Sequence, residues 1–325
     1  MQRRILGQWA AAVGMAALAL AAPARAQGFP SKTIKLVVPF PAGGGTDVMA
    51  RALGDGLSRE LGLTVIVENK AGAGTVIGND MVAKSAPDGH TLLLTTSAIA
   101  IVPSLYPKLP YRADTDLVPV VLLGVAPNVA VVRAQSPIRS AKDLLERLRA
   151  EPGHLSYASA GNGTTTHLAA ELLKNNTGLS MVHVPYRGAS PAITDLLAGQ
   201  IDVMFGTLPS VAPFIKSGKL RALGVTGGRR SPLLPDVPTF AESGAPGYEA
   251  DVLYGVFATG GTPAAAIERL EAALRTAARS EGFKRRAEAE GLVLTLNGPA
   301  DALRIQRAEE AKWRRLIKAS GITAE

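Results

Sequence analysis

Short apolar runs alternate with longer amphipathic stretches along most of the chain. Runs of roughly four to eight apolar, mostly β-branched residues are typical of strands buried on both faces of a sheet, whereas apolar residues at every third or fourth position indicate helices. The alternation predicts an α/β fold in which each sheet is mostly parallel and flanked by helices. The segments expected to be strands are 34–40, 64–68, 91–96, 129–132, 155–158, 181–184, 203–205 and 220–225.

Two helices near the C-terminus have the clearest boundaries. The first is predicted over 263–279, with Thr262 as its N-cap and a proline at the first helical position. The second is predicted over 299–319 and ends at Gly321, because glycine readily adopts the left-handed conformation that terminates a helix.

The chain is long enough to form two lobes. It has 325 residues, and a single hydrophobic core stops growing at roughly 250 to 300 residues. Two long extended stretches, 117–132 and 250–259, are expected to cross between the lobes. Lobe I would then contain residues 27–124 and 254–325, and lobe II residues 125–253. A pair of crossing strands can act as a hinge for a cleft between lobes.

The first 26 residues have the features of an export signal. Arg3 and Arg4 precede an apolar stretch at 9–22, which is followed by Ala-Arg-Ala at 24–26. The small residues on either side of one larger residue predict cleavage after Ala26. The apolar stretch is shorter than the roughly 20 residues that span a bilayer, and no later segment is long and apolar enough to do so. We therefore expect an exported protein without a membrane span.

Composition and charge exclude several classes of protein. The chain has 35 Lys and Arg against 27 Asp and Glu, a net charge of +8, and removal of the signal with its three arginines lowers this to +5. The basic clusters at 284–286 and 312–315 are interleaved with glutamates at helical spacing, which is typical of a solvated helix face. Only 5% of the residues are aromatic, so nucleic-acid binding is not expected. Because cysteine is absent and the four histidines lack ligand spacing, no metal is expected either.

A glycine-rich segment follows the first predicted strand of the mature chain. Residues 38–47 are Val-Pro-Phe-Pro-Ala-Gly-Gly-Gly-Thr-Asp, and a helix is predicted from there through Leu61. Glycines let backbone N–H groups approach a ligand, and a helix N-terminus adds unpaired donors and a positive dipole end, so the segment suits an anion. It is not a phosphate-binding P-loop, because no Gly-Lys-Ser/Thr follows. The alternative interpretation is a tight turn capped by Thr46 or Asp47.

A second segment repeats this pattern. Residues 155–167 form a predicted strand, a glycine loop and three threonines at a helix start. Thr164, Thr165 and Thr166 can each donate to a carboxylate, unless one of them is only the N-cap. Ligands of open α/β sheets bind at the carboxyl ends of strands, where both loops fall. The two loops are therefore expected to face each other across the cleft, with His167 packed beneath the second.

A third glycine segment, 72–78, has to be compared with the dinucleotide fingerprint. Its last glycine comes one residue too late for G-x-G-x-x-G, and the next predicted strand ends without the acid that would bind a ribose. We therefore interpret it as a structural turn and expect no cofactor. The alternative function, an exported NAD(P)-dependent oxidoreductase, would use this segment. No serine occupies a G-x-S-x-G elbow, and no other catalytic constellation is evident.

Several motifs recur together in one known family. They are Lys-Leu-Val-Val-Pro-Phe-Pro-Ala-Gly-Gly-Gly-Thr-Asp at 35–47, Glu-Asn-Lys-Ala-Gly-Ala-Gly at 68–74, Pro-Ser-Leu-Tyr at 103–106, Gly-Asn-Gly-Thr at 161–164 with His-Leu at 167–168, Val-Pro-Tyr-Arg-Gly at 184–188, Pro-Asp-Val-Pro-Thr at 235–239 and Gly-Thr-Pro at 261–263. With the alanine-rich export signal, this set closely resembles the Bug family, the receptors of tripartite tricarboxylate transporters. The resemblance spans essentially the whole mature chain.

The resemblance implies a fold, a location and a function. The fold would be a two-lobed, type II-like periplasmic binding protein with two crossing strands at the hinge. The protein would be periplasmic, would act as a monomer and would close on a mono- or dicarboxylic acid without catalysing a reaction. Its partner would be the permease subunits of a transporter or a sensor kinase.

By resemblance, the carboxylate is held by backbone groups, hydroxyls and ordered waters. The ligand-binding residues implied are Phe40, Pro41, Ala42, Gly43, Gly44, Thr46, Asp47, Ser97, Ala160, Gly161, Gly163, Thr164, Thr165, Thr166 and Thr207. One departure from the family pattern concerns the segment after 203–205, where many relatives have an acid and this chain has Gly206 and Thr207. A ligand amine is therefore less expected than a plain or aromatic carboxylate.

Overall fold

The computed structural model describes residues 28–324. The predicted export signal and its cleavage site lie outside the described residues. The chain divides into a short N-terminal unit that ends at Ser31 and a compact unit that begins at Lys32, and the fold is that of the second unit.

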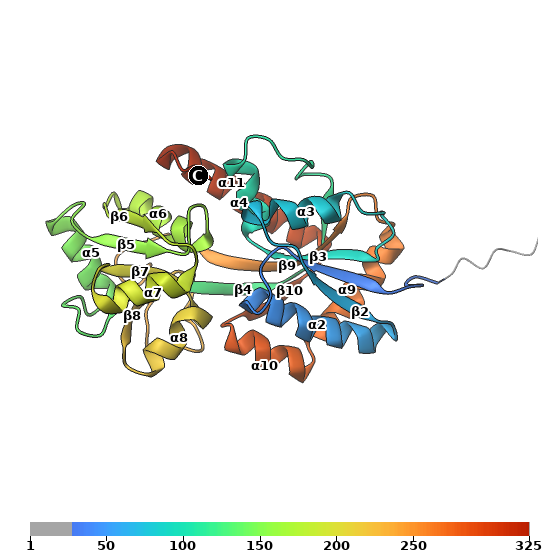
Figure 1. Ribbon diagram of the computed structural model, residues 1–325, viewed down its shortest axis with the longest axis horizontal. Coiled ribbons are helices and arrows are strands. Elements are labelled where there is room, and N and C mark those ends of the chain that lie inside the picture. The colour runs from blue at the N-terminus through green and yellow to red at the C-terminus, as the bar shows by residue number, and fades with distance from the viewer. Residues whose placement is uncertain (1–27, 325) are drawn as a thin grey trace, which may run out of the picture. The chain divides into compact units, whose positions relative to one another are not determined.

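Strands and helices alternate through most of this unit (Figure 1). The strands are β1 (Ile34–Val38), β2 (Val65–Asn69), β3 (Thr91–Thr96), β4 (Leu117–Arg133), β5 (Ser156–Ser159), β6 (Val182–Pro185), β7 (Val203–Thr207), β8 (Leu220–Val225), β9 (Asp251–Thr259) and β10 (Val293–Asn297). The helices are α2 (Gly45–Leu61), the short η1 (Ala73–Thr75), α3 (Val76–Ala83), α4 (Ala98–Leu105), α5 (Ala141–Ala150), α6 (Thr165–Thr177), α7 (Ala189–Ala198), α8 (Leu208–Lys216), α9 (Ala264–Ala278), α10 (Glu281–Ala289) and α11 (Pro299–Ser320).

The described strands form a mixed sheet in the order β2-β1-β3-β9-β4-β7-β5-β6, and β8 and β10 each pair with β4. The pairs β1–β2, β1–β3, β5–β6 and β5–β7 are parallel, as the βα pattern predicts. The remaining pairs involve β4 or β9 and are antiparallel. The α/β class is therefore confirmed, but the sheet is mixed because the two long strands run against their neighbours.

Strand β4 divides the sheet into two sections. Its first part pairs with β9 and β10, and its second part pairs with β7 and β8. We call the strands β1, β2, β3, β9 and β10 with the first part of β4 the first section, and β5 to β8 with the second part of β4 the second section. Figure 1 shows β4 and β9 running from one section toward the other. The two predicted extended stretches are thus confirmed as strands, whereas the lobe boundaries stay a prediction.

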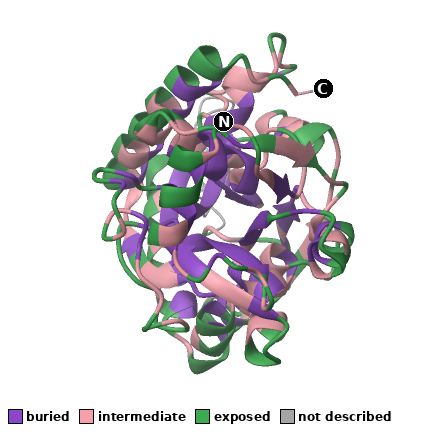
Figure 2. Ribbon diagram, turned by 90° about the vertical axis from the view of Figure 1, so that its left-hand side faces the viewer, coloured by how far each residue is buried: buried purple, intermediate pink, exposed green. Residues whose placement is uncertain are grey.

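Helices cover both faces of each section. Helices α2, α9 and α10 pack together on one side of the first section, and α3, α4 and α11 lie on the other (Figure 1). The buried residues are concentrated on the strands and on the helix faces that meet them (Figure 2). Trp313 of α11, which is 1% exposed, belongs to the core cluster that also contains Ile101 of α4 and Leu168 of α6. Helix α11 therefore packs against helices of both sections.

The two C-terminal helices begin and end close to their predicted limits. Helix α11 ends before Gly321, which has the predicted left-handed conformation with φ 61°. The predicted N-cap of α9 is wrong by one residue, because Pro263 occupies that position in an extended conformation and the Thr262 hydroxyl donates to the Thr259 carbonyl. None of the described helices is both long and apolar enough to cross a membrane.

Candidate functional site

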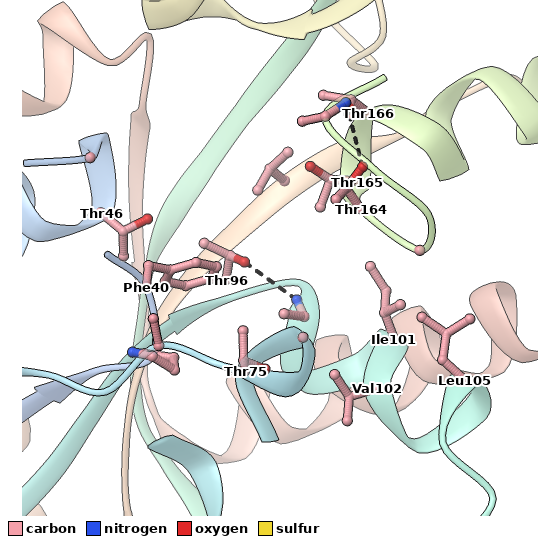
Figure 3. Close-up of a pocket in the computed structure, with 18 of the residues that line it drawn as sticks. Phe40, Thr46, Thr75, Thr96, Ile101, Val102, Leu105, Thr164, Thr165 and Thr166 are labelled. Atoms are coloured by element: carbon pink, nitrogen blue, oxygen red, sulfur yellow. Dashed lines mark hydrogen bonds between the residues drawn. The ribbon is translucent and has the colours of Figure 1, made fainter. Parts of the chain in front are cut away.

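A cavity of about 600 Å³ lies at the carboxyl ends of β1, β3 and β7. Residues of both sheet sections line it, including the first glycine loop with the start of α2 and the second glycine loop with the start of α6 (Figure 3). The carboxyl ends of strands are the usual ligand position in open α/β sheets. The two loops that the sequence singled out therefore share one cavity.

Asp47 fixes the shape of the first glycine loop. Its carboxylate accepts hydrogen bonds from the Gly43 N–H (2.9 Å), Arg51 Nε (3.1 Å) and Asn69 Nδ2 (3.0 Å). Burial alone would raise the pKa of Asp47, but these hydrogen bonds and the Arg51 charge hold it below its usual value. Gly43 has a φ of 81°, a left-handed conformation that favours glycine. Asp47 thus anchors the loop and does not line the cavity.

The start of α2 presents free donors to the cavity. Its N-cap is Gly44, which has no side chain with which to satisfy the first turn. The backbone N–H groups of Gly45 and Thr46 have no hydrogen-bond partner within residues 28–324, and neither has the Thr46 hydroxyl. Gly44, Gly45 and Thr46 all line the cavity. Unpaired N–H groups and the positive end of the helix dipole favour an anion here.

The start of α6 offers a matching set of donors from the second section. The N–H groups of Thr165 and Thr166 lack partners among the described residues. Thr164 is the N-cap and accepts the His167 N–H at 3.3 Å. These threonines lie across the cavity from Thr46 in Figure 3.

The three adjacent threonine hydroxyls are not equivalent, and the alternative that one of them is the N-cap applies to Thr164. The Thr164 hydroxyl lies 2.7 Å from the Gly161 carbonyl, to which it donates. The Thr166 Oγ accepts the Ala160 N–H at 3.1 Å and lies 2.9 Å from the Thr164 Oγ, to which its own proton is directed. The Thr165 hydroxyl has no partner in the described part of the chain. It is therefore the one of the three that is free to donate to a ligand.

An apolar wall forms another side of the cavity. Ile101, Val102 and Leu105 of α4 project into it (Figure 3), and Tyr106 and Tyr254 extend the wall. The lining within residues 28–324 includes no charged side chain. The carboxylate of Glu290, which follows α10, lies so close to the lining residue Gly45 that a side chain at position 45 would overlap it. Burial raises the pKa of Glu290.

The structure places ten of the fifteen predicted site residues on the cavity surface. They are Phe40, Pro41, Gly44, Thr46, Ala160, Gly163, Thr164, Thr165, Thr166 and Thr207. The other five, Ala42, Gly43, Asp47, Ser97 and Gly161, lie outside the lining.

The placement of Ser97 corrects the prediction by one residue. Its hydroxyl is fully buried and accepts the Leu253 N–H at 2.8 Å, so it holds β9 instead of facing the cavity. The preceding residue, Thr96, lines the cavity. Ser97 lies beyond the end of β3, as the N-cap of α4 with helical dihedral angles.

The third glycine segment also lies at the cavity. Gly72, Gly74 and Thr75 line it, which the interpretation as a purely structural turn missed. The segment forms η1 and then α3, and a side chain at Gly78 would overlap Pro39 and the Lys70 carbonyl. Close packing therefore explains that glycine. No cluster of three or more potential metal ligands occurs in the part of the chain that the structure describes.

Two glycine loops at helix N-termini that line one cavity in an α/β fold are the arrangement expected of a protein that binds an anionic solute. The family described as "Tripartite tricarboxylate transporter family receptor" matches residues 49–322. The chain therefore belongs to this family of periplasmic solute-binding proteins. The resemblance that the motifs indicated is confirmed, and the alternative of an oxidoreductase gains no support.

Relatives match over almost their whole length. Protein BugT of Bordetella pertussis is 38% identical over 309 residues, which cover 94% of this chain and 95% of BugT. The periplasmic binding protein BugD is 34% identical in a structural match with a TM-score of 0.77 that covers 91% of this chain and 99% of BugD. The structure of Rpa4515 from R. palustris with adipate is 33% identical, with a TM-score of 0.80 and coverage of 91% and 99%. The two-lobed periplasmic binding protein fold is thereby confirmed.

Proposed function

We propose that this protein is a periplasmic receptor that captures a small organic carboxylate in the cavity between the two glycine loops. The observation that carries the proposal is the pair of helix N-termini, α2 and α6, whose unpaired N–H groups reach one cavity without a charged side chain in its described lining. The adipate bound to the related Rpa4515 supports the same ligand chemistry.

The donors are sufficient to compensate a buried carboxylate. Removing a carboxylate from water costs several kcal/mol unless its oxygens are hydrogen-bonded. The N–H groups of Gly45, Thr46, Thr165 and Thr166 provide four donors, and the Thr46 and Thr165 hydroxyls add two more. Hydrogen bonds to a charged acceptor are stronger than neutral ones. Ordered waters would complete the coordination where the loops stand too far from the ligand.

The apolar wall narrows the class of acid. Ile101, Val102 and Leu105 favour a carboxylate with a sizeable hydrocarbon or aromatic body, because burying apolar surface contributes about 25 cal/mol per Å². Thr207 lines the cavity and provides no charge for a ligand amine. We therefore infer a preference for plain or aromatic mono- and dicarboxylic acids over amino acids.

We also propose that the receptor closes around its ligand. The lobes would be residues 27–124 with 254–325, and residues 125–253, joined by β4 and β9. A ligand that contacts both glycine loops stabilises the closed state, whereas one that contacts a single loop shifts nothing. The closed monomer, secreted to the periplasm after cleavage following Ala26, would be presented to permease subunits or to a sensor kinase.

A melting-shift screen tests the proposal directly. Adipate, benzoate and aspartate would each be added to the mature protein, because a ligand that binds only the native state raises its melting temperature. We expect adipate or benzoate to raise it and aspartate to have a smaller effect. If no carboxylic acid in a broader panel raises the melting temperature or gives a calorimetric signal, the proposed function is wrong.

A further inference from the structure

Two histidines are stacked beneath the second glycine loop. The rings of His167 on α6 and His183 on β6 are 3.9 Å apart between centroids and 8° from parallel. Tyr157 of β5, the cross-strand neighbour of His183, also stacks with it, with 4.7 Å between ring centroids. His167 is only 5% exposed. His167 is therefore buried under the loop that lines the cavity, and the half-buried His183 packs against it.

His167 holds this loop through one defined hydrogen bond. The Gly163 N–H donates to His167 Nδ1 at 3.0 Å. An imidazole nitrogen accepts a hydrogen bond only while it carries no proton, so His167 must be neutral with its proton on Nε2. Gly163 has a φ of 68° and packs against Leu105 of the apolar wall. The position of Gly163 in the cavity surface thus depends on the acceptor beneath it.

The surroundings keep both imidazoles neutral. Burial lowers the pKa of His167 to about 4, and the neighbouring His183 contributes to this effect. Burial likewise lowers the pKa of His183 to about 4. The charged and titratable groups around the pair are Tyr157, Glu171 and Lys174. Glu171 accepts hydrogen bonds from the Tyr157 hydroxyl and from Lys174, both at 2.6 Å, so its charge is already paired.

We propose that neutral His167 is a positioning residue for the ligand, because it fixes the second glycine loop so that the Thr165 and Thr166 donors face the cavity. The proposal rests on the proposed function for its effect on binding. Protonation of His167 places a hydrogen on Nδ1 opposite the Gly163 N–H and a positive charge against the ring of His183. The loop then loses this hydrogen bond. Ligand affinity therefore falls at low pH because His167 is protonated, in addition to any effect of protonating the ligand.

Two substitutions distinguish the contribution of the His167 Nδ1 acceptor from that of the stacked ring. His167→Asn keeps an acceptor near the position of Nδ1, whereas His167→Phe keeps the stacked ring and removes the acceptor. His154→Phe is the matched control, because His154 is exposed and lies outside the cavity lining. Circular dichroism and melting would verify that each variant folds.

The first measurement is calorimetric affinity for adipate and benzoate between pH 7.5 and 3.5. At pH 7.5 we expect His167→Asn and His154→Phe to stay within about threefold of the unsubstituted protein, and His167→Phe to bind at least tenfold more weakly. Protonation of the acid itself affects all variants equally. If the affinity falls equally at low pH in the unsubstituted protein and in His167→Asn, the proposal is wrong.

The second measurement needs no ligand and separates this proposal from the proposed function. Nitrogen chemical shifts of His167 should report the Nε2–H tautomer down to about pH 5. The Gly163 amide should be protected from hydrogen exchange in the unsubstituted protein and in His167→Asn, and exposed in His167→Phe. If neither acid binds but these results hold, only the proposed function fails. A Gly163 amide that is equally protected in His167→Phe would refute the role of His167.

Discussion

The three adjacent threonines of the second glycine loop, 164–166, have different roles. Thr164 and Thr166 direct their hydroxyl protons to the Gly161 carbonyl and to the Thr164 Oγ, and the loop depends on both. Thr165 lines the cavity, and its hydroxyl has no hydrogen-bond partner among residues 28–324. The sequence predicted that threonines would be used here, because hydroxyls follow glycines at a helix start. Which threonine faces the ligand depends on rotamers and partners that the sequence does not contain.

The hydroxyl of Thr165 is therefore expected to contribute to binding and not to stability. Thr165→Val preserves shape and removes one donor to a charged ligand, which corresponds to a loss of about 1.5 to 3 kcal/mol, or roughly 10- to 150-fold in affinity. Calorimetry with the best acid from the screen measures this loss, and the melting temperature without ligand should stay nearly constant. Thr276→Val, at an exposed position of α9, is the control. Unchanged affinity in Thr165→Val would contradict this placement of the donors.

The N-cap threonine should show the opposite behaviour. Thr164→Val removes the acceptor for the His167 N–H and the donor to Gly161, so we expect the free energy of unfolding to fall by about 1 to 2 kcal/mol. Urea denaturation of both threonine variants measures the difference. Equal stability of Thr164→Val and Thr165→Val would show that the hydroxyls are equivalent after all.

At the scale of elements, the N-termini of α2 and α6 provide the donors of the proposed site, and helix α10 places a negative charge beside one of them. Its last turn brings the Glu290 carboxylate against Gly45 at the start of α2. A negative charge near a helix N-terminus stabilises the helix by about 0.3 to 1 kcal/mol. The same charge repels an anionic ligand that uses the donors of α2. Glu290 therefore has opposing effects on stability and on binding.

Glu290→Gln should reveal these opposing effects. We expect carboxylate affinity at pH 7.5 to rise roughly three- to tenfold as the repulsion is removed, while the melting temperature without ligand falls slightly. Because burial raises the pKa of Glu290, the gain in affinity should shrink as the pH is lowered and Glu290 in the unsubstituted protein becomes neutral. Glu288→Gln, at an exposed position on the same helix, should change neither property. A Glu290→Gln variant that binds no better than Glu288→Gln would contradict the repulsion.

Elements with a strong pattern were predictable, and those without one were not. The segments 91–96 and 220–225 coincide with β3 and β8, because each is rich in apolar residues and follows a turn segment that contains glycine. Strand β10 was missed, since it is only partly buried and contains Leu296 at a φ of 51°, so neither an apolar run nor a strict alternation identifies it. The antiparallel pairing of β9 with β3 and β4 could not be predicted either, because the residues of a strand do not show which strand it pairs with.

For the whole molecule, buried titratable groups link folding to pH. In the unfolded chain histidine titrates near 6.5, whereas burial lowers the pKa of His167 and His183 to about 4 in the fold. As the pH falls from 6.5 to 4, the unfolded chain binds these protons first, and each histidine lowers the free energy of unfolding by up to about 1.4 kcal/mol per pH unit. Asp251 acts in the opposite direction between pH 6 and 4, because burial raises its pKa to about 6 and its protonation favours the fold.

The net expectation is a loss of stability on acidification below pH 6.5. Urea unfolding at intervals between pH 7.5 and 4.5 measures the slope. In the double variant His167→Asn, His183→Asn the loss should disappear, and the opposing contribution of Asp251 should become visible as a gain toward pH 4.5. Parallel pH profiles for the unsubstituted protein and the double variant would show that the histidines do not control this dependence.

The local features of this protein could be predicted from its residues alone: the βα alternation, the two glycine loops at helix starts and the family to which it belongs. These follow from residue type and spacing, which act within a few positions along the chain. Features that depend on contacts between distant segments became apparent only in the folded protein. Examples are the shared cavity, the apolar wall of α4, the approach of Glu290 to α2 and the histidine pair beneath Gly163. Such contacts join residues whose separation in sequence carries no periodic signal.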